Sequence, residues 1–164
     1  MIMNWQFNTP DLPSTQHLGR QLGVCLFPGS VIALIGPLGA GKTALVRAIA
    51  EGLDIEDSRQ VTSPTFVLMQ EYAARLPITH VDVYRLRSAA EFLDLGPEEW
   101  LGGPGVCLIE WADRVLDELP TEHMAVHIRT LTPDARQWQF QANGARHREA
   151  LACLVQRMQT EGRA

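Results

Sequence analysis

Hydrophobic and polar residues alternate at positions 2–7, which predicts a β-strand near the start of the chain. Apolar side chains then recur at helical spacing within residues 14–26, and we expect Ser14 to cap a helix there. Positions 31–35 are all apolar, a pattern typical of a strand buried on both faces of a parallel sheet. A glycine-rich loop follows, and residues 42–51 predict a helix ended by the next glycine.

The rest of the chain continues to alternate between strands and helices. The remaining expected elements are strands at 65–72, 78–84, 106–109, 124–131 and 137–141, and helices at 88–95, 112–119 and 146–159. Together they predict one α/β domain over residues 1–164, with a mostly parallel central sheet and added antiparallel strands.

One segment matches a phosphate-binding motif in full. Residues 36–43 read Gly-Pro-Leu-Gly-Ala-Gly-Lys-Thr, which fits G-x-x-x-x-G-K-[ST] between a buried strand and a helix. Glycines allow backbone N–H groups to cradle phosphate oxygens, and the helix N-terminus adds its positive dipole. We therefore predict a P-loop NTPase with a three-layer α/β sandwich fold. The nucleotide-binding residues expected in and beside this loop are Gly36, Leu38, Gly39, Ala40, Gly41, Lys42, Thr43 and Ala44.

The basic residue of this motif is unusual for the chain. Of fourteen basic residues thirteen are arginine, and Lys42 is the single lysine. Its ammonium group is expected to neutralise the β- and γ-phosphates, and the Thr43 hydroxyl is expected to bind Mg²⁺.

Two carboxylates are candidates for the acid that a P-loop enzyme needs near its metal ion. Glu110 comes directly after four apolar residues, whereas Asp82 lies within an alternating strand. We expect Lys42, Asp82 and Glu110 as catalytic residues, and Thr43, Asp82 and Glu110 around Mg²⁺. Which acid ligates the metal directly is left open. A loop carrying Ser63 and Thr65 is placed to sense the γ-phosphate, although a plain turn fits equally well.

The motifs of GTPases are missing from the sequence. No D-x-x-G follows the loop, and the single lysine excludes a separate N-K-x-D, so ATP is the expected nucleotide. Two alternatives to an ATPase remain open: a small-molecule kinase, and a nucleotide-gated binding module without turnover. No acceptor site is marked for a kinase.

Composition narrows the class of protein further. The net charge of −5 argues against charge-driven DNA binding, and no apolar stretch approaches the length of a membrane span. The three cysteines are an odd number without a C-x-x-C pair. We therefore expect small buried hydrophobic residues rather than a disulfide scaffold, and a cytoplasmic protein.

Several motifs in order resemble those of the TsaE (YjeE) family, the ATPases of bacterial tRNA threonylcarbamoyladenosine synthesis. They are the phosphate loop at 36–43, Ser-Pro-Thr-Phe at 63–66 with Tyr72, His-Val-Asp-Val-Tyr-Arg-Leu at 80–86, Glu-Phe-Leu-Asp-Leu-Gly at 91–96, and Leu-Ile-Glu-Trp at 108–111. Pro37 departs from the usual Asp or Asn of the family and removes one backbone N–H from the loop.

The resemblance implies an activity and a set of partners. Such proteins bind ATP and Mg²⁺, hydrolyse ATP weakly, and act on the complex of TsaB and TsaD. The partner TsaD modifies adenosine 37 of ANN-decoding tRNAs, so contact with tRNA is expected only through that complex. By resemblance Trp111 lies at the site, and the adenine base lies close to residues 8–12, with Leu12 as the expected contact.

Overall fold

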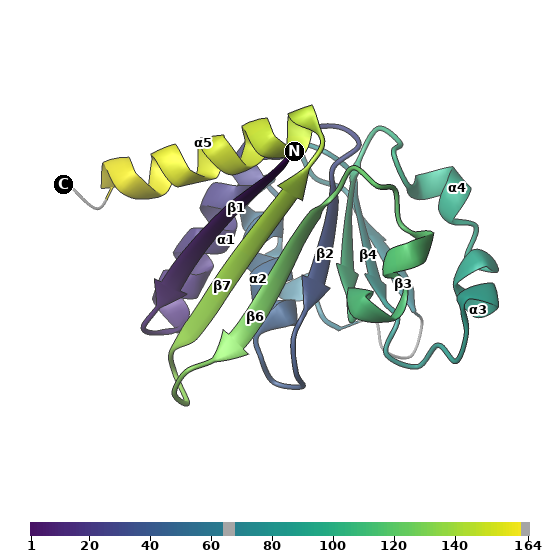
Figure 1. Cartoon of the computed structure of the whole chain (residues 1–164), viewed down its shortest axis with the longest axis horizontal. Coiled ribbons are helices and arrows are strands. Elements are labelled where there is room, and N and C mark those ends of the chain that lie inside the picture. Colours follow the sequence, from purple (N-terminus) through teal and green to yellow (C-terminus); the bar gives the residue numbers. More distant parts are fainter. Residues whose placement is uncertain (64–67, 162–164) are drawn as a thin grey trace.

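The apolar run predicted as a buried strand forms β2 (Val31–Ile35) in the interior of a β-sheet. The computed structural model describes residues 1–63 and 68–161. In those residues the strands are β1 (Ile2–Thr9), β2, β3 (Met69–Tyr72), β4 (Ile78–Asp82), β5 (Val106–Glu110), β6 (Met124–Thr130) and β7 (Arg136–Asn143). They form a seven-stranded sheet in the order β1-β7-β6-β2-β5-β4-β3 (Figure 1).

The four inner strands from β6 to β4 run parallel, while β7, β1 and β3 join antiparallel. The α/β class with a parallel centre and antiparallel additions is therefore confirmed. Because β2, β5 and β4 are parallel, their carboxyl ends lie at the same edge of the sheet. In the register, Leu34 of β2 pairs with Glu110 of β5, and Glu110 pairs with Asp82 of β4. This edge brings together the ends of the strands that carry the candidate acids.

Helices cover both faces of the sheet. They are α1 (Leu12–Cys25), α2 (Lys42–Gly52), α3 (Ala89–Leu93), α4 (Pro97–Trp100) and α5 (Ala145–Glu161). One apolar core packs α1, α2 and α5 against the sheet, and a second lies beneath α3 and α4, which Figure 1 shows near β3 and β4. No helix in residues 1–63 or 68–161 has both the length and the apolar character needed to cross a membrane.

Helices α1 and α2 pack against each other with little space between their backbones. A Cβ atom on Gly52 would lie 2.1 Å from the Arg20 carbonyl oxygen, and one on Gly23 would lie 2.3 Å from the Ile49 carbonyl oxygen. Contacts this short are sterically forbidden, so glycine at both positions permits the close approach. The phosphate-loop helix is thereby held firmly against the rest of the domain.

Helix α1 begins earlier than the sequence predicts. Its N-cap is Asp11, whose carboxylate accepts a hydrogen bond from the Ser14 backbone N–H at 2.8 Å. The prediction that Ser14 is the cap was wrong, because Asp11 caps the helix and Pro13 lies inside its first turn. Proline is tolerated in the first turn of a helix, where its missing N–H has no intrahelical partner.

The segment after β5 also differs from its prediction. Instead of one helix at 112–119, two short 3₁₀ turns form, Ala112–Arg114 and Leu116–Glu118. A left-handed residue, Trp111, precedes them, and Val115 between them is not α-helical. The expected strand at 65–72 is observed as β3 (Met69–Tyr72), and residues 64–67 lie outside the described residues. A further 3₁₀ turn, Ser58–Gln60, follows α2.

The cysteines correct the expectation from the sequence. Cys25 at the end of α1 forms a disulfide with Cys153 of α5, and Cys107 is free and buried. The two bonded residues are separated by 128 positions, and only the packing of α5 on α1 brings them together. Spacing along the sequence gives no indication of such a pair.

Helix α5 is joined to the sheet through a buried histidine near its start. The backbone N–H of Val31 donates a hydrogen bond of 3.1 Å to Nε2 of His147, whose ring meets Phe27 edge-on. Burial lowers the pKa of His147 to about 4, with smaller contributions from the positive fields of His123 and Arg146. Only the neutral ring can accept this hydrogen bond, so folding selects the unprotonated form.

Acidification is therefore expected to weaken the fold through His147. An unfolded histidine has a pKa of about 6.5, so between that pH and 4 the unfolded chain binds the additional proton. Stability attributable to this group is complete above pH 6.5 and falls as the pH is lowered, by about 2 kcal/mol at pH 5. Urea unfolding of the wild type and of His147→Gln at pH 7.5 and pH 5 measures the difference. The glutamine variant retains an acceptor and should lose about 2 kcal/mol less, whereas equal losses would contradict the assignment.

Candidate functional site

The glycine-rich loop connects the end of β2 to the start of α2. Gly39 and Gly41 have φ values of 74° and 104°, in the left-handed region that favours glycine. A pocket of about 440 Å³ lies over this turn. It is lined by Leu38, Gly39, Ala40, Gly41, Lys42, Thr43, Ala44, Ser63, Asp82, Tyr84, Glu110 and Trp111. The structure thus gathers nearly all the residues expected from the sequence around one cavity at the N-terminus of a helix.

Lys42 is buried and faces the loop from the first turn of α2. Its Nζ atom donates hydrogen bonds of 2.7 Å and 2.8 Å to the carbonyl oxygens of Gly36 and Pro37. Gly36 does not line the pocket itself but is one of these acceptors. Burial lowers the pKa of Lys42, and the negative fields of Glu110 and Asp82 partly oppose this effect. The Lys42 ammonium group is thus held against the loop in the lining of the pocket.

The indole ring of Trp111 lies against the Lys42 ammonium group in the pocket wall. The Lys42 ammonium lies 3.8 Å from the centroid of the Trp111 ring, a cation–π contact, and the ring of Tyr84 packs at 4.7 Å. Trp111 has φ 60° directly after β5, a conformation uncommon for a residue with a Cβ atom. This backbone turn directs the indole toward the loop. The side chain therefore belongs to the pocket wall rather than to the apolar core alone.

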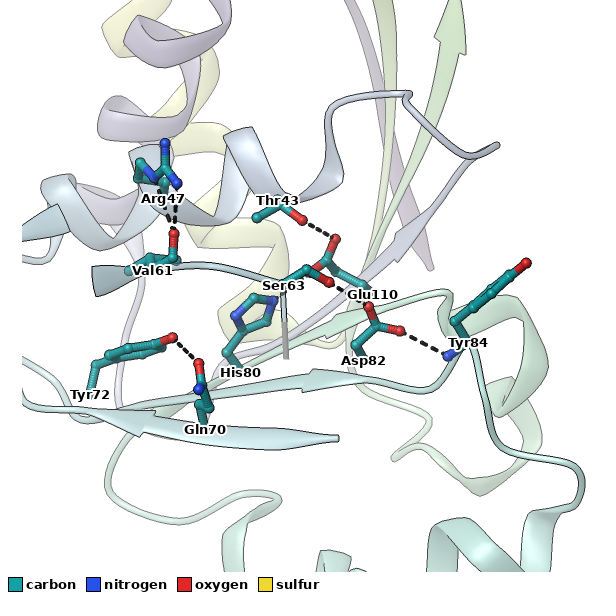
Figure 2. Close-up of polar contacts among 10 residues, drawn as sticks. All are labelled: Thr43, Arg47, Val61, Ser63, Gln70, Tyr72, His80, Asp82, Tyr84 and Glu110. Atoms are coloured by element: carbon teal, nitrogen blue, oxygen red, sulfur yellow. Dashed lines mark hydrogen bonds and ion pairs between the residues drawn. The ribbon is translucent and has the colours of Figure 1, made fainter. Parts of the chain in front are cut away.

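A hydrogen bond joins the phosphate loop to the end of β5. The Thr43 hydroxyl donates to Oε1 of Glu110 at 2.9 Å, and Figure 2 shows the two side chains pointing toward each other. Glu110 is buried at the end of β5, a strand whose other four residues are apolar. A hydroxyl and a carboxylate are thus placed side by side at the mouth of the loop.

Asp82 occupies the matching position at the end of β4. Its Oδ1 atom accepts a hydrogen bond from the Tyr84 backbone N–H, and its Oδ2 atom accepts one from the Ser63 hydroxyl, both at 2.9 Å (Figure 2). Arg47 of α2 donates to the Val61 carbonyl oxygen and fixes the segment that leads to Ser63. The expected residue Thr65 lies outside the described residues. The predicted switch-like loop is therefore joined, at Ser63, to a strand-end acid.

Sequence reasoning assigned no role to His80, although the residue lies only two positions before Asp82. The structure places its Nε2 atom 2.6 Å from Oε2 of Glu110. The contact depends on the pairing of β4 with β5, which the sequence does not specify. The periodicity of a strand could have indicated only that His80 and Asp82 share a face.

Arg136 is a second residue whose contact the sequence leaves unassigned. From the first position of β7 its Nε atom donates a 2.9 Å hydrogen bond to the Ala40 carbonyl oxygen. Beside it is a smaller pocket of about 220 Å³, lined by Leu12, Thr15, Ala40, Gly41, Ala44, Pro133, Asp134 and Arg136. Leu12 thus lies outside the larger pocket, but three residues of the loop and helix α2 line both pockets.

The polar groups of the site suit a divalent cation shared with phosphate. Among the described residues no three His, Cys, Asp or Glu side chains form a metal-binding cluster. Mg²⁺ needs no such cage, since it binds through one or two carboxylates, a hydroxyl, water and the phosphates of its substrate. Thr43, Glu110 and Asp82 provide donors of this kind beside the loop.

Comparison with known proteins gives a consistent result. The sequence model of the family described as "Threonylcarbamoyl adenosine biosynthesis protein TsaE" matches residues 9–138. The tRNA threonylcarbamoyladenosine biosynthesis protein TsaE of Treponema pallidum (strain Nichols) is 44% identical over 123 residues, covering 75% of this chain and 90% of that protein. The protein of the same name from Bacillus subtilis (strain 168) is 39% identical over 146 residues, covering 88% and 89%.

A solved structure resembles the whole fold. The crystal structure of Bacillus subtilis YdiB superposes with a TM-score of 0.80 and 32% sequence identity, covering 96% of this chain and 97% of that one. The matched sequence range includes both the phosphate loop and the two strand-end acids. On these grounds the chain belongs to the TsaE family of tRNA threonylcarbamoyladenosine biosynthesis proteins.

Proposed function

We propose that this protein is a slow Mg²⁺-dependent ATPase that serves threonylcarbamoylation of adenosine 37 in ANN-decoding tRNAs. In this proposal it acts on the complex of TsaB and TsaD, and it does not transfer the threonylcarbamoyl group itself. Membership of the TsaE family supports the pathway. The cytoplasm, where tRNA is modified, is the proposed location.

The observation that carries the enzymatic part is the hydrogen bond between Thr43 and Glu110. A hydroxyl from the phosphate-loop helix and a buried carboxylate from β5 lie 2.9 Å apart beside the lysine of the loop. An ordinary glycine-rich turn has no need of a buried acid at this place. The arrangement provides phosphate-binding and cation-binding groups in one pocket, which is what phosphoryl transfer requires.

Each polar residue of the pocket has a separate proposed role in hydrolysis. Lys42 holds positive charge against the β- and γ-phosphates, while Thr43 and Glu110 hold the cation. Mg²⁺, when bound, neutralises the charge that develops on the phosphate oxygens. Asp82, which accepts hydrogen bonds from Ser63 and Tyr84, is placed to orient the attacking water. The smaller pocket with Leu12 is the proposed place of the base, because it adjoins the same loop.

The link between Ser63 and Asp82 offers a route from the nucleotide to a partner. A change in the contacts of Asp82 during hydrolysis would alter the hydrogen bond that anchors the Ser63 loop. A partner that binds one loop conformation better than the other then responds to the nucleotide state. In this scheme water receives the phosphoryl group and the partner responds to the nucleotide state, so no separate phosphate acceptor is needed.

Replacing Glu110 by glutamine should impair metal-dependent turnover while preserving the shape of the side chain. The amide can still meet Thr43, but it lacks the charge that holds a cation, so we expect at least a roughly 10-fold loss of Mg²⁺-ATP hydrolysis. Steady-state phosphate release is measured on the pure protein, alone and with the TsaB–TsaD pair. The matched control is Glu98→Gln, which removes an exposed carboxylate on α4 and should leave the rate unchanged.

Three possible results of this experiment distinguish the proposed partner-dependent ATPase from the alternatives. Slow hydrolysis that the TsaB–TsaD pair changes markedly, and that Glu110→Gln loses, supports the whole proposal. Hydrolysis that ignores the pair would contradict the partner assignment and leave a nucleotide hydrolase or kinase. Wild-type rates in Glu110→Gln would contradict the metal role of Glu110.

A further inference from the structure

A completely buried imidazole lies beneath the pocket, behind the acid of β5. The side chains of His80 and Glu110 are 0% and 3% exposed, and His80 Nε2 is 2.6 Å from Glu110 Oε2. An ionised carboxylate offers only acceptors, so the hydrogen-bonded nitrogen is the N–H donor. The other ring nitrogen, Nδ1, has no hydrogen-bond partner among the described residues. Within the part of the chain that the structure describes, the one directed polar contact of the ring is with the candidate metal ligand.

The sheet register explains how His80 reaches Glu110. His80 pairs with Leu108, and Asp82 pairs with Glu110, in two adjacent parallel strands. His80 and Glu110 are thus diagonal neighbours on the same face of the sheet, two residues apart along the strands. The ring has the length to cover this diagonal, whereas a short side chain does not.

The two oxygens of Glu110 are held separately by different elements. Oε1 accepts from Thr43 on α2, and Oε2 accepts from His80 on β4. A carboxylate held at one oxygen alone could rotate about its terminal bond. Donors at both oxygens fix the plane of the group beside the phosphate loop.

We infer that His80 is a positioning residue that orients Glu110 as the ligand of the cation. This inference rests on the proposed function, because it assumes that Glu110 binds Mg²⁺. Residues that donate hydrogen bonds to metal ligands set ligand orientation in many metal sites, and their loss weakens metal affinity by roughly 10- to 100-fold. A buried ring with one nitrogen unpaired among the described residues is a costly way to fill core space, which an aliphatic side chain would fill without that cost.

The test compares His80→Leu with His80→Gln. Leucine fills the space without a donor, while the glutamine amide can restore one near the position of Nε2. ADP affinity is measured by calorimetry at a series of Mg²⁺ concentrations and in EDTA. The affinity in EDTA reports binding of the nucleotide alone, and its increase with Mg²⁺ reports binding of the metal. His147→Gln is the matched control, since His147 is also buried but lies away from the pocket.

We expect His80→Leu to need roughly 10- to 100-fold more Mg²⁺ for the same gain in ADP affinity. Its affinity in EDTA should stay within about twofold of wild type, and His80→Gln should recover much of the loss. The inference is overturned if His80→Leu keeps the wild-type Mg²⁺ dependence, or if it loses affinity equally with and without metal. A wild-type protein whose ADP affinity ignores Mg²⁺ would instead refute the proposed metal site, and this inference with it.

Discussion

Lys42→Ala is expected to reduce Mg²⁺-ATP hydrolysis to background, a loss of at least about 100-fold. The side chain brings a full positive charge into the pocket, where burial excludes the water that would otherwise screen it. Alanine leaves the backbone cradle in place but removes the charge that offsets the phosphates. Phosphate release by the purified variant, with nucleotide affinity measured in parallel, determines the size of the loss.

Lys42→Arg should be almost as inactive, although it keeps the charge. The ammonium sits between two backbone carbonyl oxygens and the face of Trp111, at 2.7 Å, 2.8 Å and 3.8 Å. A planar guanidinium is larger and directs its donors in a fixed fork, so it cannot reproduce these contacts. Arg59→Ala, which removes an exposed cation, is the control for charge alone. Activity near wild type in either Lys42 variant, with the fold verified by circular dichroism, would contradict the site.

The phosphate loop could be predicted because its chemistry is local. Eight consecutive residues carry the motif, and the apolar run before them identifies the strand that must precede it. Glu110 was recognisable for the same reason, since four apolar residues lead directly into it. In both cases the information lies within one strand or one turn.

Contacts between separate strands and helices could not be predicted in this way. His80 reaches Glu110 only because β4 and β5 pair in one particular register. Arg136 reaches the Ala40 carbonyl oxygen from β7, far along the chain. His80 begins one of the family-like motifs, but the position of neither residue along the sequence indicates which group it contacts.

The start of α1 and the segment after β5 show a different limit. Asp11 and Ser14 are both good capping residues, and the helix began at the earlier one because proline is compatible with its first turn. After β5, the left-handed turn at Trp111 directs the indole into the pocket, and no continuous α-helix follows. The helical preference of residues 112–119 was therefore overridden by the backbone turn that places Trp111 in the pocket.

Reduction of the Cys25–Cys153 disulfide is expected to cause the largest loss of stability. The bond closes a loop across 128 positions, and the chain-entropy relation gives roughly 5 kcal/mol for a loop of this length, as an upper figure. Without the bond, α5 is held to α1 by apolar packing and by polar side-chain contacts such as that of Arg157 with Gln21. We therefore expect Tm to fall by up to roughly 10–20 °C.

Thermal and urea unfolding with and without a phosphine reductant measures this contribution. A Cys25→Ser/Cys153→Ser variant should have the stability of the reduced wild type, and the reductant should not change it. Cys107→Ser is the matched control, because Cys107 forms no disulfide. Its thiol is buried, which raises its pKa to about 12. We expect the reductant to lower the stability of this variant as much as that of the wild type. Three titratable thiols in the unreduced, denatured wild type, or a Tm that ignores the reductant, would contradict the bond. Because the bond joins two helices that pack against each other, its loss should lower stability while leaving the geometry of the phosphate loop, and hence ADP affinity below the new Tm, unchanged.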